Sequence, residues 1–596
     1  MYAQRLAAVR QHLGHLRVDA FLLPRSDDYL NEDLAPADER LCWLSGFTGS
    51  QGLLAVTAQS VALLVDGRYR LQAERECEGF ADVLPEGDDQ LFAWLAQRLP
   101  AGANLLADAR LHSVAQWAGW QRRAAERGWV LTACQANPVD SCWQGRPAAA
   151  VSQVTAQPLQ WAGEPAASKL ALLAVQLREQ GCDALWLPAP DMLAWLLNVR
   201  GRDIAIAPLP FSCGLFYADG RLDWFIDEQR LALPEGWLPD TVRVVPATAA
   251  GCLGELLQQQ GVRRVWVDET SCNASSFELL RASGCELYRA THPLPLLRAC
   301  KNAAELAGTR EAHRRDGLAL CRFLHAFETC PENYRRGDEL TVSAALEGFR
   351  RMDEDFRGVS FDTIAACGAN AAQPHYLPKV GQAAAVTEGE LLLVDSGGQY
   401  PQGTTDVTRV LPVGPPTEYQ RGLYTQVLRA HIALADSRFP RGTSGQRLDI
   451  LARQVMWQAG LDYAHGTGHG VGSYLQVHEG PHRISPHASP VALQPGMITS
   501  IEPGVYLEGQ LGIRIENLYE VIECPRHPGF LRFRALTLAP FESALIDRQQ
   551  LSATERAWLD EYHQNVCRQL LPALAPDVAA WLRAKTAVAK QSAALS

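Results

Sequence analysis

Four carboxylates and one histidine in the C-terminal half of the chain have the residue types of a metal-binding site. They are Asp395, Asp406, His469, Glu502 and Glu516. Hard oxygen donors with one imidazole suit manganese, cobalt or zinc better than a metal that prefers thiolates. Because several carboxylates can bridge two ions about 3.5–4 Å apart, the set favours two divalent ions over one. Each residue alone would more often be a turn, cap or loop residue, so the prediction depends on their joint occurrence.

The expected strands explain how the carboxylates could meet. Asp395 ends the apolar run LLLVD, where an ionised carboxylate would be costly to bury without a cation. Asp406 follows eleven residues later, and the glycines between them permit a hairpin that would bring the two together. In the last expected strand, alternation places Arg514 and Glu516 on one face and two isoleucines on the other.

The glycine-rich segment 465–482 (HGTGHGVGSYLQVHEGPH) supplies the histidine. Glycines on both sides of His469 let the backbone approach a ligand closely. Two other interpretations are weaker. The string HEGPH matches the H-E-x-x-H zinc motif, but Gly480 and Pro481 disfavour the helix which that motif requires. The string GTGHGVG lacks the G-x-G-x-x-G spacing of a dinucleotide-binding loop.

Strands and helices are expected to alternate around these residues, in a mixed domain that begins near residue 302. The expected strands are 390–398, 404–413, 497–507 and 512–523, and the expected helices are 417–436 and 446–459.

The first half of the chain contains two similar segments, 18–30 and 182–201. Each follows a helical pattern and joins a buried strand to a proline and an aspartate, which predicts a duplicated α/β domain. The Ala-, Gln- and Pro-rich stretch from Trp143 to Ser168 is expected to be a linker, and the residues after about 580 a polar tail. The predicted domains are 1–150, 165–300, 302–535 and a C-terminal extension at 536–596.

Composition excludes several classes of protein. A chain of 596 residues with 47% hydrophobic residues is too long for one core. Its net charge of -11 disfavours nucleic acid and anionic lipid as partners. No export signal or membrane-spanning run is recognisable, and the 15 cysteines form no C-x-x-C pair. A cytoplasmic protein with reduced thiols, without nucleic-acid or membrane partners, is the expectation.

The motifs together resemble those of the aminopeptidase P (Xaa-Pro aminopeptidase) family, in the three-domain form of the pita-bread metallopeptidases. The resemblance rests on VDSGGQYPQGTTDVTR, HGTGHGVGSYLQVHEGP, SIEPGVY and GIRIEN, and it covers nearly the whole chain. It implies an α/β (α+β) fold, with two related creatinase-type N-terminal domains followed by a pita-bread catalytic domain. It also implies two divalent ions, with manganese expected first, and a homodimer.

The implied activity is hydrolysis of the first bond of peptides with proline at the second position, by a hydroxide bridging the two ions. Glu502 would accept the proton, and His375 and His478 would contact substrate and relay protons. Arg68, His465 and Arg514 would also contact the peptide, although surface roles are the ordinary alternative for such residues. A prolidase that cleaves only Xaa-Pro dipeptides, and a non-catalytic binding module with the same fold, remain as alternatives.

Overall fold

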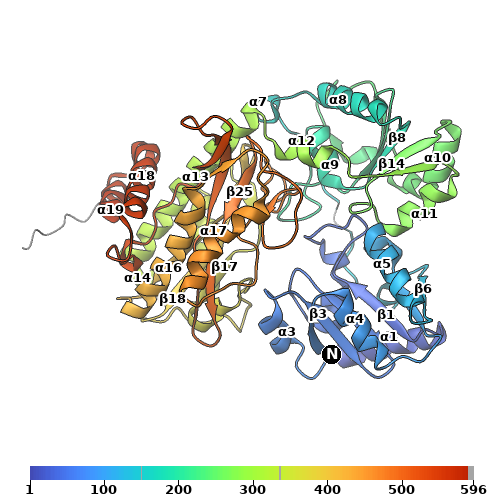
Figure 1. The fold of residues 1–596 in the computed structure, drawn as a ribbon, viewed down its shortest axis with the longest axis horizontal. Helices are drawn as coiled ribbons and strands as arrows, with labels where there is room; N and C mark the ends of the chain where they lie inside the picture. Colours follow the sequence, from blue (N-terminus) through green and yellow to red (C-terminus); the bar gives the residue numbers. More distant parts are fainter. Residues whose placement is uncertain (150, 335–336, 588–596) are drawn as a thin grey trace, which may run out of the picture. The chain divides into compact units, whose positions relative to one another are not determined.

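The computed structural model describes residues 1–149, 151–334 and 337–587, and the chain divides into two compact units, Met1–Pro295 and Leu296–Ser596. In Figure 1 the first unit is coloured blue to green and the second yellow-green to red. None of the described helices is both long and apolar enough to cross a membrane.

The first unit contains two six-stranded sheets with the same topology, in the orders β4-β3-β2-β1-β5-β6 and β13-β11-β10-β8-β14-β15. The strands of the first sheet are β1 (Ala20–Pro24), β2 (Leu53–Thr57), β3 (Val61–Val65), β4 (Asp82–Pro85), β5 (Asn104–Ala107) and β6 (Val130–Ala133). Those of the second are β8 (Ala184–Leu187), β10 (Cys213–Tyr217), β11 (Leu222–Phe225), β13 (Val242–Val245), β14 (Arg264–Val267) and β15 (Glu286–Arg289). Strands β1 and β8 each pair antiparallel on one side and parallel on the other, so the predicted duplication is confirmed.

A helix precedes the central strand of each sheet. Helix α1 (Tyr2–His15) buries Leu6, Val9 and Leu13, and α8 (Ala166–Glu179) buries apolar residues at the same helical spacing. This spacing puts one apolar stripe against a sheet and leaves the polar face to solvent.

The stretch from Trp143 to Ser168, expected to be a linker, is folded over part of its length. Strand β7 (Val154–Ala156) pairs with β9 (Val199–Arg200) and β12 (Leu231–Ala232), and α7 (Leu159–Ala162) follows it. The linker expectation is wrong here, because a three-residue strand has too short a pattern to be recognised without its partners.

The second unit combines small sheets with long helices. Its main strands are β17 (Ile364–Cys367), β18 (Leu391–Ser396), β19 (Gly398–Tyr400), β20 (Gly403–Thr404), β21 (Val407–Pro412), β22 (Arg438–Pro440), β23 (Gly468–His469), β24 (Arg483–Ile484), β25 (Ile498–Ile501), β26 (Gly504–Leu507), β27 (Leu511–Arg514), β28 (Asn517–Glu523) and β29 (Phe530–Ala535). Its main helices are α13 (Ala303–Thr329), α15 (Glu339–Arg350), α16 (Glu418–Ala435), α17 (Gly445–Gln458), α18 (Ala553–Leu570) and α19 (Pro576–Thr586). Helices α16 and α17 lie side by side (Figure 1) and share one apolar core with strands β25 to β28.

Three of the expected strands are interrupted at a predicted metal ligand. Asp406 lies between β20 and β21, Glu502 between β25 and β26, and Glu516 between β27 and β28. At each break the side chain leaves the alternation of the strand and is free to point into a shared space.

The expectation of a polar tail after about residue 580 is wrong for the residues up to Thr586, because α19 continues to that residue. Leu582 is fully buried, and Lys585 forms ion pairs with Glu328 and Glu542. The rest of the expected tail, 588–596, lies outside the described residues.

Candidate metal centre

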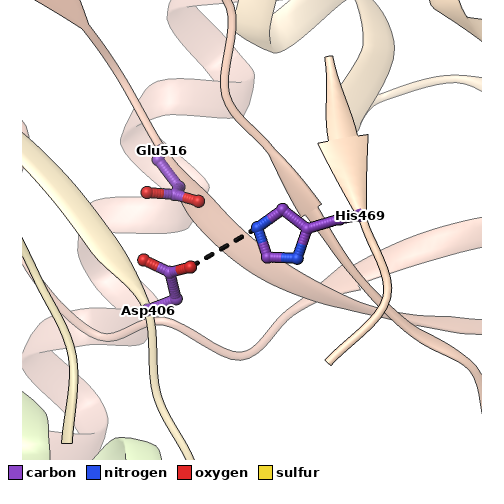
Figure 2. A group of neighbouring side chains, drawn as sticks. All are labelled: Asp406, His469 and Glu516. Atoms are coloured by element: carbon purple, nitrogen blue, oxygen red, sulfur yellow. Dashed lines mark ion pairs between the residues drawn. The ribbon is translucent and has the colours of Figure 1, made fainter. Parts of the chain in front are cut away.

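Three of the five predicted ligands converge in the second unit. Ligand atoms of Asp406, His469 and Glu516 all lie within 4.8 Å of one another, and Figure 2 shows the three side chains facing a common space. His469 Nε2 is 3.5 Å from Asp406 Oδ2 and also 3.5 Å from Glu502 Oε1. Glu502 therefore borders the same space as the other three.

Asp395 reaches the group from the neighbouring strand. Strands β18 and β21 pair antiparallel with Asp395 opposite Thr408, which confirms the hairpin expected from the spacing of the two aspartates. The Thr408 hydroxyl donates to Glu516 Oε2 at 2.7 Å. Arg514 Nη2 donates to Asp395 Oδ2 at 2.5 Å, and Arg514 Nε donates to the Thr408 hydroxyl at 3.2 Å. The pairing of β18 with β21 thus links Asp395 to Glu516 through two side chains.

The carboxylates lack enough partners for their charge. Asp395 Oδ1 and Asp406 Oδ1 are buried without a hydrogen-bond partner among the described residues. Burial raises the pKa of Asp395 to about 6; Arg514 opposes this shift, and the charge of Asp406 adds to it. Burial, together with repulsion from Asp406 and Asp395, raises the pKa of Glu516 well above its ordinary value. Divalent cations would satisfy the orphaned oxygens and cancel the repulsion, so this donor set fits a metal centre.

The glycines beside His469 are required by close packing of the backbone. A Cβ atom on Gly468 would lie 2.0 Å from the Ser500 carbonyl oxygen, and one on Gly470 would lie 2.0 Å from the Glu479 carbonyl oxygen. His469 Nδ1 is 2.9 Å from the Gly470 carbonyl oxygen, which fixes the proton on Nδ1 because a carbonyl only accepts. Nε2 is then left with its lone pair towards the carboxylates, as a metal ligand requires.

The other predicted histidines lie near this centre. The His478 ring is 4.4 Å from the His469 ring, centroid to centroid, and nearly perpendicular to it. His465 Nδ1 is 4.0 Å from Glu502 Oε2, and its Nε2 is 2.8 Å from the Tyr506 hydroxyl. His375 is half-buried and follows Pro374, whose carbonyl accepts from Arg514 Nη1 at 3.0 Å. The structure therefore places His478 and His465 beside the centre, and His375 next to a residue whose carbonyl binds Arg514.

The two predicted arginines differ in their surroundings. Arg514 is buried and uses its donors on Asp395, Thr408, the Pro374 carbonyl and Tyr506. Arg68 belongs to the first unit, where its guanidinium pairs with Asp66 at 2.7 Å. Contact of either arginine with a peptide stays a prediction.

Sequence reasoning missed two features around the centre. Tyr506 joins His465 to Arg514, with its hydroxyl 2.8 Å from both side chains. Glu479 is buried in ion pairs with Lys301 and, at 3.1 Å, with Arg298. The segment 478–482 contains no helix, so the rejection of the H-E-x-x-H motif is confirmed. Strand alternation in GVYL could have indicated that the Tyr506 side chain faces the centre. No local pattern could have indicated that Glu479 pairs with Lys301, because the two residues are 178 positions apart in the sequence.

Comparison with known proteins gives a consistent result over the whole chain. Models of the creatinase/prolidase N-terminal domain match residues 5–135 and 145–305, the metallopeptidase family M24 model matches 307–523, and a model of the C-terminal region of that family matches 529–589.

Full-length relatives extend this result. Aminopeptidase P1 of Arabidopsis thaliana is 34% identical, covering 96% of each chain, and a probable Xaa-Pro aminopeptidase P of Laccaria bicolor is 34% identical, covering 97% of this chain and 92% of its own length. The crystal structure of X-prolyl aminopeptidase from Caenorhabditis elegans superposes with a TM-score of 0.93 at 31% identity, over 98% of this chain and 99% of that one. The chain belongs to the aminopeptidase P group of metallopeptidase family M24, with two creatinase-type domains before a pita-bread domain.

Proposed function

We propose that this chain is a two-metal aminopeptidase that removes the first residue from peptides with proline at the second position. The observation that carries the proposal is the convergence of Asp406, His469 and Glu516 within 4.8 Å, in a chain whose full-length relatives are aminopeptidases P. The Caenorhabditis elegans relative is described as having a di-nuclear active site, which supports two ions over one.

The ligands proposed for the two ions are Asp395, Asp406, His469, Glu502 and Glu516. Divalent ions bound by these residues would supply Lewis acidity for a peptide carbonyl and would lower the pKa of a water molecule towards neutrality. Manganese is the proposed metal, with zinc or cobalt as the other choices, because the donors are four carboxylates and one imidazole.

Glu502 is proposed to accept the proton of the attacking water. Its side chain is 17% exposed, whereas those of Asp395 and Asp406 are 10% and 5% exposed. A carboxylate that borders the ligand space and also meets solvent can take a proton and pass it on. The Ser500 hydroxyl donates to Glu502 Oε1 at 3.1 Å and holds this carboxylate in place.

The histidines are proposed to act on the substrate. His478 lies against the His469 ring and can donate a hydrogen bond to the oxyanion that develops on the carbonyl. His375 is proposed to contact substrate and to return a proton to the proline nitrogen, and His465, Arg514 and Arg68 to help hold the peptide. The homodimer and the cytoplasmic location remain part of the proposal. The Caenorhabditis elegans relative is described as cytosolic.

The test compares hydrolysis of Arg-Pro and Arg-Pro-Pro by the purified chain, after chelation and after addition of manganese. We expect manganese to restore cleavage of Arg-Pro-Pro, and an Asp406→Asn variant to bind less metal and to remain inactive. A preference for the dipeptide would identify a prolidase instead. Failure of every divalent metal to restore peptidase activity would indicate a non-catalytic module. Light scattering measures whether the chain is a dimer.

A further inference from the structure

A second cavity in the Leu296–Ser596 unit has a different chemistry from the metal centre. It is open to solvent, has a volume of about 750 Å³ and is bordered by α13, the end of α16, strands β22, β28 and β29, and α18. Six arginines and three carboxylates line it, although the chain as a whole has a net charge of -11. The arginines are Arg310, Arg314, Arg438, Arg532, Arg534 and Arg568.

Two of these arginines are held in position by one buried carboxylate. Arg310 and Arg534 both bind Glu520 through their Nε and Nη2 groups, and the Glu520 side chain is only 4% exposed. The side chains of Arg310 and Arg534 remain 44% and 45% exposed, and both line the cavity. One carboxylate that orients two cations leaves a net positive charge in a fixed geometry.

Two more arginines are placed against each other. Arg438 in β22 lies directly opposite Arg532 in β29 in the antiparallel register. Like charges at directly opposed positions destabilise a sheet. Arg438 has one carboxylate partner, Asp436, at 3.8 Å, and no carboxylate of the described residues lies within 4.0 Å of Arg532. A bound anion would remove this repulsion.

The remaining lining sets the size and kind of the anion. The acidic groups offset only part of the positive charge. Against six arginines stand the three lining carboxylates and Glu520, so the formal charge around the cavity is +2. Trp558 and Tyr562, stacked on each other in α18, add an aromatic wall. Guanidinium groups bind phosphate in bidentate fashion, and several at fixed positions match an ion that carries adjacent phosphates. A cavity of about 750 Å³ suits a small molecule, and the excess negative charge elsewhere disfavours a long polyanion.

We propose that this cavity binds a small anion with two or more linked phosphate groups, either inorganic oligophosphate or the phosphate chain of a nucleotide. The site is separate from the proposed peptidase chemistry, since none of the predicted metal ligands lines it.

Isothermal titration of the metal-loaded full-length chain tests the proposal with inorganic triphosphate, ATP and orthophosphate. We expect triphosphate to bind at least tenfold more tightly than orthophosphate, and the double variant Arg438→Gln/Arg532→Gln to lose at least tenfold in affinity. Arg447→Gln is the matched control, because Arg447 is exposed on α17 and does not line the cavity. Chelation of divalent ions by triphosphate contributes equally to wild type and control, so the difference between variants reports the cavity.

ATP binding more tightly than triphosphate would identify a nucleotide site in which the base contacts Trp558. Equal affinities would identify the oligophosphate itself. The single variant Arg532→Gln, which changes one exposed side chain, replaces the double variant should that fail to fold. Equal binding by wild type and Arg532→Gln, or binding of RNA in preference to triphosphate, would overturn the proposal.

Discussion

Arg514 Nη2 lies 2.5 Å from Asp395 Oδ2, and the two side chains are only 3% and 10% exposed. One oxygen of this proposed metal ligand is thus neutralised by the protein, and Oδ1 is left buried without a partner among the described residues. The arginine lets Asp395 keep its charge in the metal-free fold, and the unpaired oxygen is the one a cation would take.

Replacement of Arg514 by methionine is expected to lower the stability of the metal-free chain by roughly 3 kcal/mol, because breaking a buried ion pair leaves the other charge uncompensated. Manganese should recover part of this loss, since a cation replaces the missing positive charge. Urea unfolding with and without manganese measures both effects. The exposed Arg447→Met is the control, and equal metal-free stability of wild type and Arg514→Met would contradict the prediction.

The titration of Asp395 should lower the free energy of unfolding of the metal-free chain as the pH rises from 3.8 to about 6. Its pKa is raised from 3.8 to about 6, so in this window the folded state binds more protons than the unfolded state. Ligands must be deprotonated to bind metal, so the stabilisation by manganese should grow as the pH rises above about 6.

Thermal unfolding between pH 4 and pH 8, with and without manganese, measures this dependence. In Asp395→Asn the metal-free melting temperature should lose this part of its pH dependence, because the amide does not titrate. A manganese-induced rise in Tm that is equal at pH 5 and pH 8 would argue against it.

The buried ion pairs of Glu479 are expected to position His478, the residue before it. Lys301→Met removes one partner, and we expect a loss of roughly 3 kcal/mol in stability because Glu479 is left with less compensation. The turnover number of the peptidase should fall more than the metal content, since His478 and not a ligand is displaced. Unfolding, metal analysis and kcat measured on the same samples separate these effects. Normal kcat in a destabilised Lys301→Met variant would show that the ion pairs only stabilise the fold.

The convergence of Asp406, His469 and Glu516 could be predicted from sequence because the signals are local. The glycines between Asp395 and Asp406 indicated the hairpin, whereas the strand expected to carry both Arg514 and Glu516 is interrupted at Glu516. The pairing of Lys301 with Glu479 has no such signal, since it depends on how segments 178 residues apart pack. The role of Arg68 stays a prediction for a related reason, because that residue belongs to the other unit.

The arginine-rich cavity was missed for the same reason. Arg532 and Arg534 alternate visibly in FLRFRA, but α13 and β22 supply Arg310 and Arg438 from distant parts of the chain. The segment around β7 was predicted to be a linker because of its composition. It contains a short strand, which forms only through pairing with β9 and β12. Local sequence patterns therefore predicted the convergence of Asp406, His469 and Glu516, whereas the arginine-rich cavity depends on tertiary packing.

The close packing of Gly470 against the Glu479 backbone allows a test of the metal centre in which every proposed ligand is kept. In Gly470→Ala the new Cβ would lie 2.0 Å from the Glu479 carbonyl oxygen, so either the His469 segment or the Glu479 segment must move. We expect weaker metal binding and a large loss of activity, because displacements of about 1 Å at a catalytic site cost roughly 10²-fold in rate. The matched control is Gly422→Ala in α16, where nothing lies within 4 Å of the added Cβ and alanine should stabilise the helix by roughly 0.5–1 kcal/mol. Metal content and kcat/KM of both variants decide the matter: if Gly470→Ala keeps wild-type values for both, the close packing of this loop does not position His469.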